Sequence, residues 1–284
     1  MSRARALLLF ALAGGLPAAE ALREFGPGIW VRPGASAVFS GKLLYDQGPE
    51  DGLEAIATLR ASKLHESLVE LDTADAMRVL AALVVVFGEG RGVPPDSLSD
   101  LPPRGDPASV SIAWRTAAGP WISTPASQLV RDRRNDRALA SLPAVWSGGA
   151  LGTYLSPDGS GTTYQKPVLT QAGAVCALFD EENGAPLAIA VPHPAEDKCW
   201  EANSAKLPPT GTPVMLIVTP LRLERTLAPD RPLAEALQAA GGPGLRIEVP
   251  ADRPRRADSD LQHALVAEAA RLGVAVAPVF VPQR

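Results

Sequence analysis

Histidine and cysteine, the residues that most often build metal and nucleophilic sites, are scarce in this sequence. Among 284 residues there are three histidines and two cysteines. His65, His193 and His263 are far apart in the chain, so a zinc site of three imidazoles would need all of them to converge. The zinc-protease pattern also fails, because Val69 stands where His65-Glu66 needs a second histidine one helical turn later. The sequence therefore predicts no metal and no cofactor.

Positive charge and long apolar runs are also lacking. The formal net charge is −4, which argues against a nucleic-acid-binding protein, because such proteins need a basic face. The nearest approach to an apolar run beyond the N-terminus, residues 81–87, is far short of the roughly 20 residues that span a membrane. Hydrophobic residues make up 46% and charged residues 20%, as in ordinary globular proteins of one or two domains.

The first 21 residues have the pattern of a secretory signal. Arg3 and Arg5 give a positive start, residues 6–13 are apolar, and Ala19-Glu20-Ala21 supplies a cleavage pattern of small residues. We expect cleavage after Ala21 or after Ala19, and export to the periplasm or cell envelope. The mature chain is then not expected to span a membrane. An uncleaved interfacial anchor is the alternative.

Export makes the two cysteines candidates for a disulfide. Cys176 and Cys199 would meet in an oxidising compartment, where such bonds persist. A bridge would contribute about 3 kcal/mol in the chain-entropy model. Sequence spacing does not tell whether the two residues are close in the fold, so the bridged and reduced forms both stay open.

Residues 22–222 read as one domain made mainly of strands. Alternating or fully apolar segments are separated by turns rich in glycine and proline. Strands are expected at 37–45, 53–59, 65–71, 109–115, 173–179, 187–191 and 213–219. The fold class predicted for this domain is α+β, with an antiparallel or mixed sheet and few helices. The charged segment 128–135 is expected to be a solvated helix or loop.

One helix is predicted directly after the third of these strands. Asp72-Thr73 resembles an N-cap, and Gly88 is placed to end the helix. Its apolar face is expected to be buried. The residues of that face are Met77, Leu80, Ala81, Val84 and Val85.

The character of the sequence changes near Leu221. Residues 223–232 are expected to be a linker, and residues 233–284 a small α+β module. Within this module the pattern predicts helices at 233–240 and 259–272 and strands at 245–249 and 274–281.

The densest group of chemically versatile side chains is Lys63, His65, Glu66 and Ser67. In a strand, His65 would share one face with Lys63 and Ser67, and Glu66 would lie on the other. Such a row suits an anion. In the structural alternative, His65 bonds a backbone carbonyl and Glu66 pairs with an arginine. The serine of Asp158-Gly159-Ser160-Gly161 lacks the first glycine of a nucleophile elbow and reads as a loop.

Two segments resemble the YdjY-like family of exported bacterial proteins. They are Lys63-Leu64-His65-Glu66-Ser67, and Trp200-Glu201-Ala202-Asn203 followed by Leu207-Pro208-Pro209-Thr210-Gly211-Thr212-Pro213-Val214. The likeness covers residues 30–220. It implies export and a domain boundary rather than a mechanism, since the family has no established activity, and it adds Asn203 to the candidate binding residues. The chain departs from the family at 177–179, where Ala-Leu-Phe replaces Ser-Asn-Phe.

The tail has a weaker likeness. Val249-Pro250-Ala251-Asp252-Arg253 and the segment 270–274 are similar to the periplasmic domain of ExbD/TolR-type proteins. Those domains dimerise, so the resemblance implies an interaction module through which the chain can form oligomers.

No catalytic or cofactor motif is complete, which favours a non-catalytic function. Our hypothesis is a binding or interaction protein of the bacterial envelope, with an envelope protein or a cell-wall component as partner. The alternative is a small-ligand-binding or metal-binding domain, or a hydrolase, centred on Lys63, His65 and Glu66.

Overall fold

The computed structural model describes most of the chain between residues 21 and 221 and three strands beyond it. The described ranges are 21–90, 105–139, 141–157, 159–178, 184–189, 191, 199–221, 225–227, 245–250 and 276–281. Within these ranges strands dominate, with two helices, α1 (Ala76–Phe87) and the short α2 (Leu169–Ala172), and the 3-10 turn η2 (Ala126–Leu129). The predicted sheet with few helices is confirmed, but the fold is mostly β rather than evenly α+β.

The main sheet closes on itself as an eight-stranded barrel. Around the ring the order is β3-β16-β6-β10-β14-β13-β4-β5, and β5 returns to pair with β3. Neighbours are antiparallel except for β4–β5 and β13–β14, so the sheet is mixed. In chain order the strands are β3 (Ser36–Leu43), β4 (Ala55–Thr58), β5 (Ser67–Leu71), β6 (Asp106–Arg115), β10 (Ala144–Trp146), β13 (Ala174–Ala177), β14 (Leu187–Ile189) and β16 (Pro213–Pro220).

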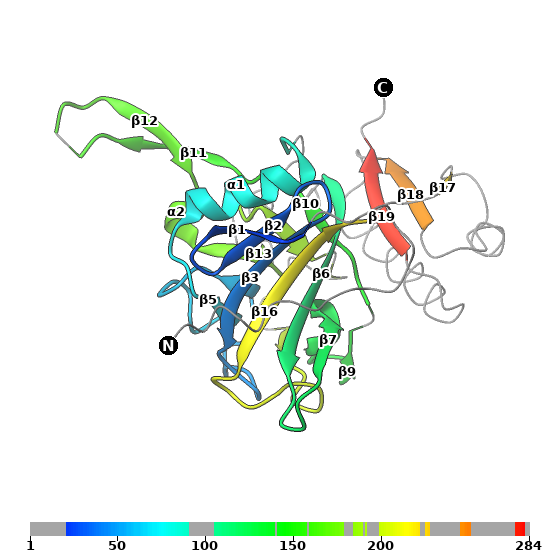
Figure 1. The fold of residues 1–284 in the computed structure, drawn as a ribbon. Helices are drawn as coiled ribbons and strands as arrows, with labels where there is room; N and C mark the ends of the chain where they lie inside the picture. Colours follow the sequence, from blue (N-terminus) through cyan, green and yellow to red (C-terminus); the bar gives the residue numbers. More distant parts are fainter. Residues whose placement is uncertain are drawn as a thin grey trace.

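Other strands extend this sheet or form small sheets of their own. β1 (Arg23–Gly26) and β2 (Ile29–Arg32) continue from β3, and β7 (Trp121–Pro125) pairs with β6. A three-stranded sheet joins β15 (Trp200–Ala202), β8 (Val130–Asp132) and β9 (Arg137–Ala138). β11 (Leu151–Leu155) and β12 (Thr163–Pro167) form a hairpin that projects from the body on the side where α1 lies (Figure 1).

Three strands from the C-terminal part form a parallel sheet. β17 (Arg225–Leu227) pairs with β18 (Leu245–Pro250), which pairs with β19 (Val276–Val281). β18 and β19 coincide with the strands predicted in the tail, and β17 falls inside the segment predicted to be a linker. The two helices predicted at 233–240 and 259–272 lie outside the described residues.

The barrel closes where β3 changes partner. Residues 36–39 pair with β2, and residues 41–43 pair with β5 along the same edge. Gly41 permits the close approach, because a side-chain carbon there would run into the carbonyl oxygen of Glu70 on β5. Ser40 secures the junction on both sides, since its N–H donates to Gly28 and its carbonyl accepts from Asp72 at 2.9 Å.

Helix α1 lies against β2 and β3, and its position follows from that junction. The side chain of Asp75 accepts the backbone N–H of Arg78 at 3.0 Å, and Gly88 ends the helix with φ of 82°. The predicted helix and its C-terminus are therefore confirmed, with the cap at Asp75 rather than Asp72-Thr73. None of the helices among the described residues is long and apolar enough to cross a membrane.

The predicted buried face of α1 is wrong except at Leu80, which is partly buried and packs against the core. The helix buries Ala76, Val79, Ala82, Leu83 and Val86. Met77, Val84 and Val85 are instead 58%, 39% and 37% exposed. The periodicity misled because eleven of the twelve helical residues are apolar, so both faces look like core. The entry of the chain from β5 decides which face meets the sheet.

We predict that Gly41→Ala weakens the barrel more than a glycine replacement in open space. Overpacking against Glu70 should cost about 2–3 kcal/mol of unfolding free energy. The control is Gly34→Ala, where φ is 63° and nothing lies within 4 Å of the added carbon, so only a backbone cost of about 1 kcal/mol is expected. Urea unfolding measures both, and equal losses would contradict a special role for the β3–β5 contact.

Candidate functional site

Three candidate residues lie in the connection between β4 and β5. These strands are parallel neighbours, with Ala55 opposite Ser67. Residues 59–66 join them, although parallel crossovers usually need a dozen residues or more. The strand predicted at 65–71 begins only at Ser67, because residues 59–66 form the connection between the two strands. His65 and Glu66 lie in a loop, and the expected row of side chains on one strand face does not exist.

Backbone contacts hold this loop tightly. Ala61 and Lys63 adopt positive φ angles of 59° and 42°, which residues other than glycine rarely take. The hydroxyl of Thr58 donates to the carbonyl of Ser62 at 2.9 Å, and that of Ser67 donates to the carbonyl of Lys63 at 2.8 Å. Ser67 is fully buried, so it fastens the loop rather than presenting a hydroxyl to a ligand.

Glu70 of β5 also holds the 59–66 loop in place. Glu70 is 5% exposed, and its carboxylate forms an ion pair with Lys42 at 2.6 Å and accepts the N–H of Ala61 at 2.9 Å. Burial by itself would raise the pKa of Glu70. The ammonium of Lys42 and the Ala61 hydrogen bond outweigh that effect and hold the pKa below its ordinary value.

The charged side chains of the loop satisfy one another. The ammonium of Lys63 lies 3.5 Å from Glu54 and 3.4 Å from Glu66, and the other oxygen of Glu66 lies 3.1 Å from Nε2 of His65. The predicted arginine partner of Glu66 is thus a lysine and a histidine. Both oxygens of Glu66 are engaged, so a role as base or metal ligand would first require breaking one of these contacts. The His65 side chain is 73% exposed.

Asn203 has a different position and a structural role. It is 7% exposed, its side-chain amide donates to the carbonyl of Gln128 at 3.0 Å, and its N–H donates to Leu129 at 2.9 Å. These bonds fasten the end of β15 to η2. Asn203 does not join the Lys63 loop through any of them.

The proline-rich segment before β16 is a turn. Gly211 has φ of 82° and donates its N–H to Leu43 at 2.8 Å. The Thr210 hydroxyl donates to the Asp46 carboxylate and accepts the Asp46 N–H, both at 3.1 Å. This segment, which carries half of the family resemblance, therefore connects β16 to the end of β3.

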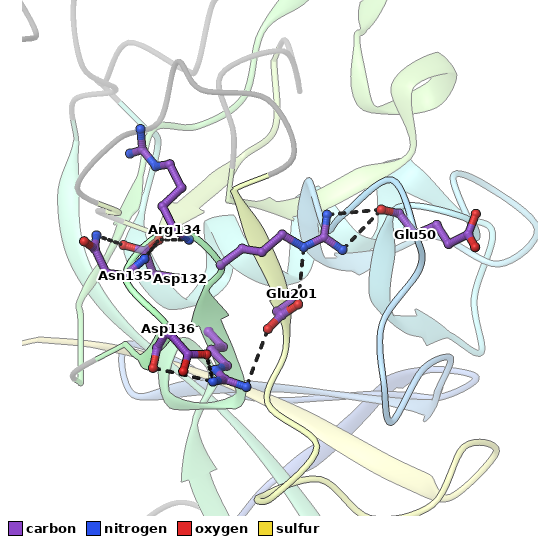
Figure 2. A network of polar contacts seen from close by, with 8 residues as sticks. Glu50, Asp132, Arg134, Asn135, Asp136 and Glu201 are labelled. Atoms are coloured by element: carbon purple, nitrogen blue, oxygen red, sulfur yellow. Dashed lines mark hydrogen bonds and ion pairs between the residues drawn. The ribbon is translucent and has the colours of Figure 1, made fainter.

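An arginine network that the sequence did not reveal ties β8 to β15. Arg131 and Arg133 contact opposite oxygens of Glu201, at 3.7 Å and 3.3 Å. Figure 2 shows Glu201 between two guanidinium groups. Arg131 also pairs with Asp136, and Arg133 donates to the carbonyl of Glu50 at 3.1 Å. Each guanidinium already contacts carboxylate or carbonyl oxygens, so the network joins neighbouring segments rather than forming an open anion site.

Asp132 shows why the solvated helix or loop predicted at 128–135 is wrong in part. It is 1% exposed at the end of β8 and accepts bonds from the N–H of Arg134 and from the side chain of Asn135, at 3.0 Å and 2.6 Å (Figure 2). Burial alone would raise its pKa, but these hydrogen bonds lower it below the ordinary value. Arg131 and Arg133 flank the buried Asp132, and this alternation with a period of two residues is the sequence signal from which a strand could have been predicted.

The projecting hairpin was also missed, apart from its turn. Residues 159–161 lie in that turn, as the loop prediction has them, and Asp158 lies outside the described residues. On one face Tyr154 is paired with Tyr164, with ring centroids 6.1 Å apart, and the Lys166 ammonium lies 4.4 Å from the Tyr154 ring. The opposite face carries Leu151 and Leu155, which are 67% and 71% exposed.

The candidate disulfide is not present in the structure. Cys176 lies in β13 of the barrel and Cys199 precedes β15 in a different sheet, and no bond joins them. Both are buried among apolar side chains, and burial strongly raises the pKa of the Cys176 thiol. No group of three histidine, cysteine, aspartate or glutamate side chains suited to a metal ion occurs in the described part of the chain.

We predict that Glu70→Gln destabilises the protein in a pH-dependent way. At neutral pH the loss should be about 1–3 kcal/mol, since a buried charged hydrogen bond is removed. The folded-state pKa lies below the ordinary value of 4.5, so the carboxylate contributes fully above that pH and loses its contribution as the pH falls through the folded-state pKa. Urea unfolding from about pH 7 to about pH 3, an interval that includes the titration of carboxyl groups, measures the effect. The difference in unfolding free energy between variant and wild type should shrink below pH 4.5.

The exposed Glu24→Gln variant on β1 is the control and should show little change at any pH. A Glu70→Gln gap that stays constant through the acid range would contradict the ionised state of Glu70.

Comparison of the chain with protein-family models, with curated proteins and with solved structures gave no match. The resemblance to the YdjY-like family and that of the tail to ExbD/TolR-type domains therefore stay predictions.

Proposed function

We propose that this protein is an exported, non-catalytic binding protein of the bacterial envelope. The observation that carries the proposal is the β11–β12 hairpin, which projects from the body (Figure 1). Leu151 and Leu155 are exposed on one of its faces. We call this hairpin the arm. A two-stranded ribbon is marginally stable on its own in water. Leucines exposed on such a ribbon gain free energy when a partner covers them.

The remaining polar clusters support a binding role over a catalytic one. The Lys63 loop and the Arg131–Glu201 network consist of ion pairs that satisfy each other and join neighbouring segments. Asn203 and Ser67 make structural hydrogen bonds. The arm, by contrast, has apolar side chains whose exposure has no role within the chain.

Export is supported by the place where the strands begin. β1 starts at Arg23, so cleavage after Ala19 or Ala21 leaves every described strand whole. An envelope protein or a cell-wall component is the proposed class of partner. The tail is proposed to be a small α+β interaction module, since its three strands are parallel and parallel strands need crossovers long enough for a helix.

We predict that the arm contacts the envelope partner inside the cell. A photo-crosslinking amino acid placed at Leu155 should yield a specific adduct in the periplasmic or envelope fraction. The matched control is Ile122 on β7, which is 39% exposed and lies far from the arm (Figure 1). Full-length chain that stays in the cytoplasm, or equal adducts from both positions, would contradict the proposal.

The alternative site at Lys63, His65 and Glu66 is favoured by one observation, the exposed imidazole beside a carboxylate. If it binds a small ligand or metal, divalent cations or cell-wall fragments should raise the melting temperature of wild type, because ligands that bind only the folded state stabilise it. The shift should vanish in His65→Ala. The binding role of the arm predicts no shift that depends on His65.

A further inference from the structure

The outer face of α1 is apolar and uncovered among the described residues. Met77, Ala81 and Val84 lie at helical spacing on one stripe, and Val85 flanks it. Met77 is 58% exposed. A helix that is apolar on all sides is normally buried on all sides, yet the barrel covers only the opposite face. The stripe therefore has the properties of a surface that another element covers.

The arm and this stripe match in length and in charge. Leu151 and Leu155 lie four strand steps apart, about 13 Å. Met77 and Val84 lie seven helical steps apart, about 11 Å, with the small Ala81 between them. The leucine face of the arm carries threonine and glutamine beside its leucines and no charged residue. Neither surface would have to desolvate an unpaired charge on contact.

The two surfaces do not cover each other within one chain. Leu151, Leu155 and Met77 are each more than half exposed. The root of the arm is fixed beside the C-terminal end of α1, because Gly148 and Gly90 approach so closely that neither could carry a side chain. The arm is thus held next to the helix but directed away from it (Figure 1).

We infer that the arm of one copy packs on the α1 stripe of a second copy, so that the chain forms a dimer by reciprocal exchange of arms. This inference rests on the proposed binding role of the arm and names its partner. A two-fold axis that places one arm on the partner's helix places the partner's arm on the first helix, and the assembly closes.

Charge disfavours a membrane surface as the occupant. Helices that lie on membranes carry lysine and arginine beside their apolar face. Arg78 is the only charged residue of α1, and it is paired with Asp75 at 3.4 Å. The chain has a net charge of −4, which opposes attraction to anionic lipids.

The test compares the oligomeric state of the purified chain with that of three variants. Wild type should be a dimer by light scattering and sedimentation. Leu151→Ser with Leu155→Ser, and separately Met77→Ser with Val84→Ser, should each raise the dimer dissociation constant by at least about 100-fold, because each replaces four apolar side chains over the two symmetric contacts. Ile122→Ser is the control and should leave the dimer intact. All five substituted positions are exposed, and circular dichroism checks that the variants fold.

A mixing experiment identifies the contact. One preparation carries Leu155→Cys and the other Met77→Cys or Val84→Cys, and a short bismaleimide is added. The native Cys176 and Cys199 are 0% and 3% exposed and give little background. Linked heterodimers in the mixture, stronger than linked homodimers of either preparation alone, are expected.

Failure of the arm exchange and failure of the proposed function give different results. A monomer, or a dimer that neither pair of substitutions weakens, overturns the exchange of arms. If the arm still gives specific envelope adducts in cells, the proposed function stands without it. Co-sedimentation with phosphatidylglycerol vesicles that depends on the arm would replace the second copy with a membrane. A monomer without arm-dependent adducts would refute both proposals.

Discussion

The pairing of β3 with β5 is the contact on which the rest of the fold depends. It closes the barrel, and it is possible because Gly41 leaves room for the carbonyl oxygen of Glu70. The same strand β5 carries the buried carboxylate that holds the 59–66 loop through Ala61. Its end at Asp72 is bonded to Ser40, which sets the direction of the chain into α1. Closure thus determines both where the charged loop lies and which face of α1 is buried.

This arrangement separates structural polar groups from exposed apolar ones. The ion pairs of Lys63 and of Glu201 link segments that the barrel brings together. Removing one partner of such a pair leaves the other charge uncompensated, so these contacts hold the joined segments in one arrangement. Among the described residues, the most exposed large apolar side chains are Leu151 and Leu155 on the arm and Met77 on the outer stripe of α1. The proposed binding function rests on these surfaces rather than on the polar clusters.

The sequence predicted the strands that have a clear pattern and failed where two patterns compete. The segments 109–115 and 213–219 fall inside β6 and β16, because their alternation or their apolar run is bounded by clear turns. The helix was found, but its buried face could not be chosen, since Met77 and Val79 are equally apolar. Lys63, His65 and Glu66 do lie close together, yet a strand was expected because Leu68 to Leu71 extends the apolar signal. The Glu201 network joins residues far apart in the chain, and one sequence carries no signal for such pairs.

Hydrogen exchange at the amides of β11 and β12 tests the central claim most directly. An uncovered two-stranded ribbon exchanges quickly, because little free energy opposes its opening. The account predicts that these amides exchange quickly in dilute protein and become protected as the concentration rises, together with the amides of α1. The barrel strands should be protected throughout. Exchange in the arm that stays equally fast at every concentration, and in the presence of envelope extract, would contradict the claim that the arm is a binding surface.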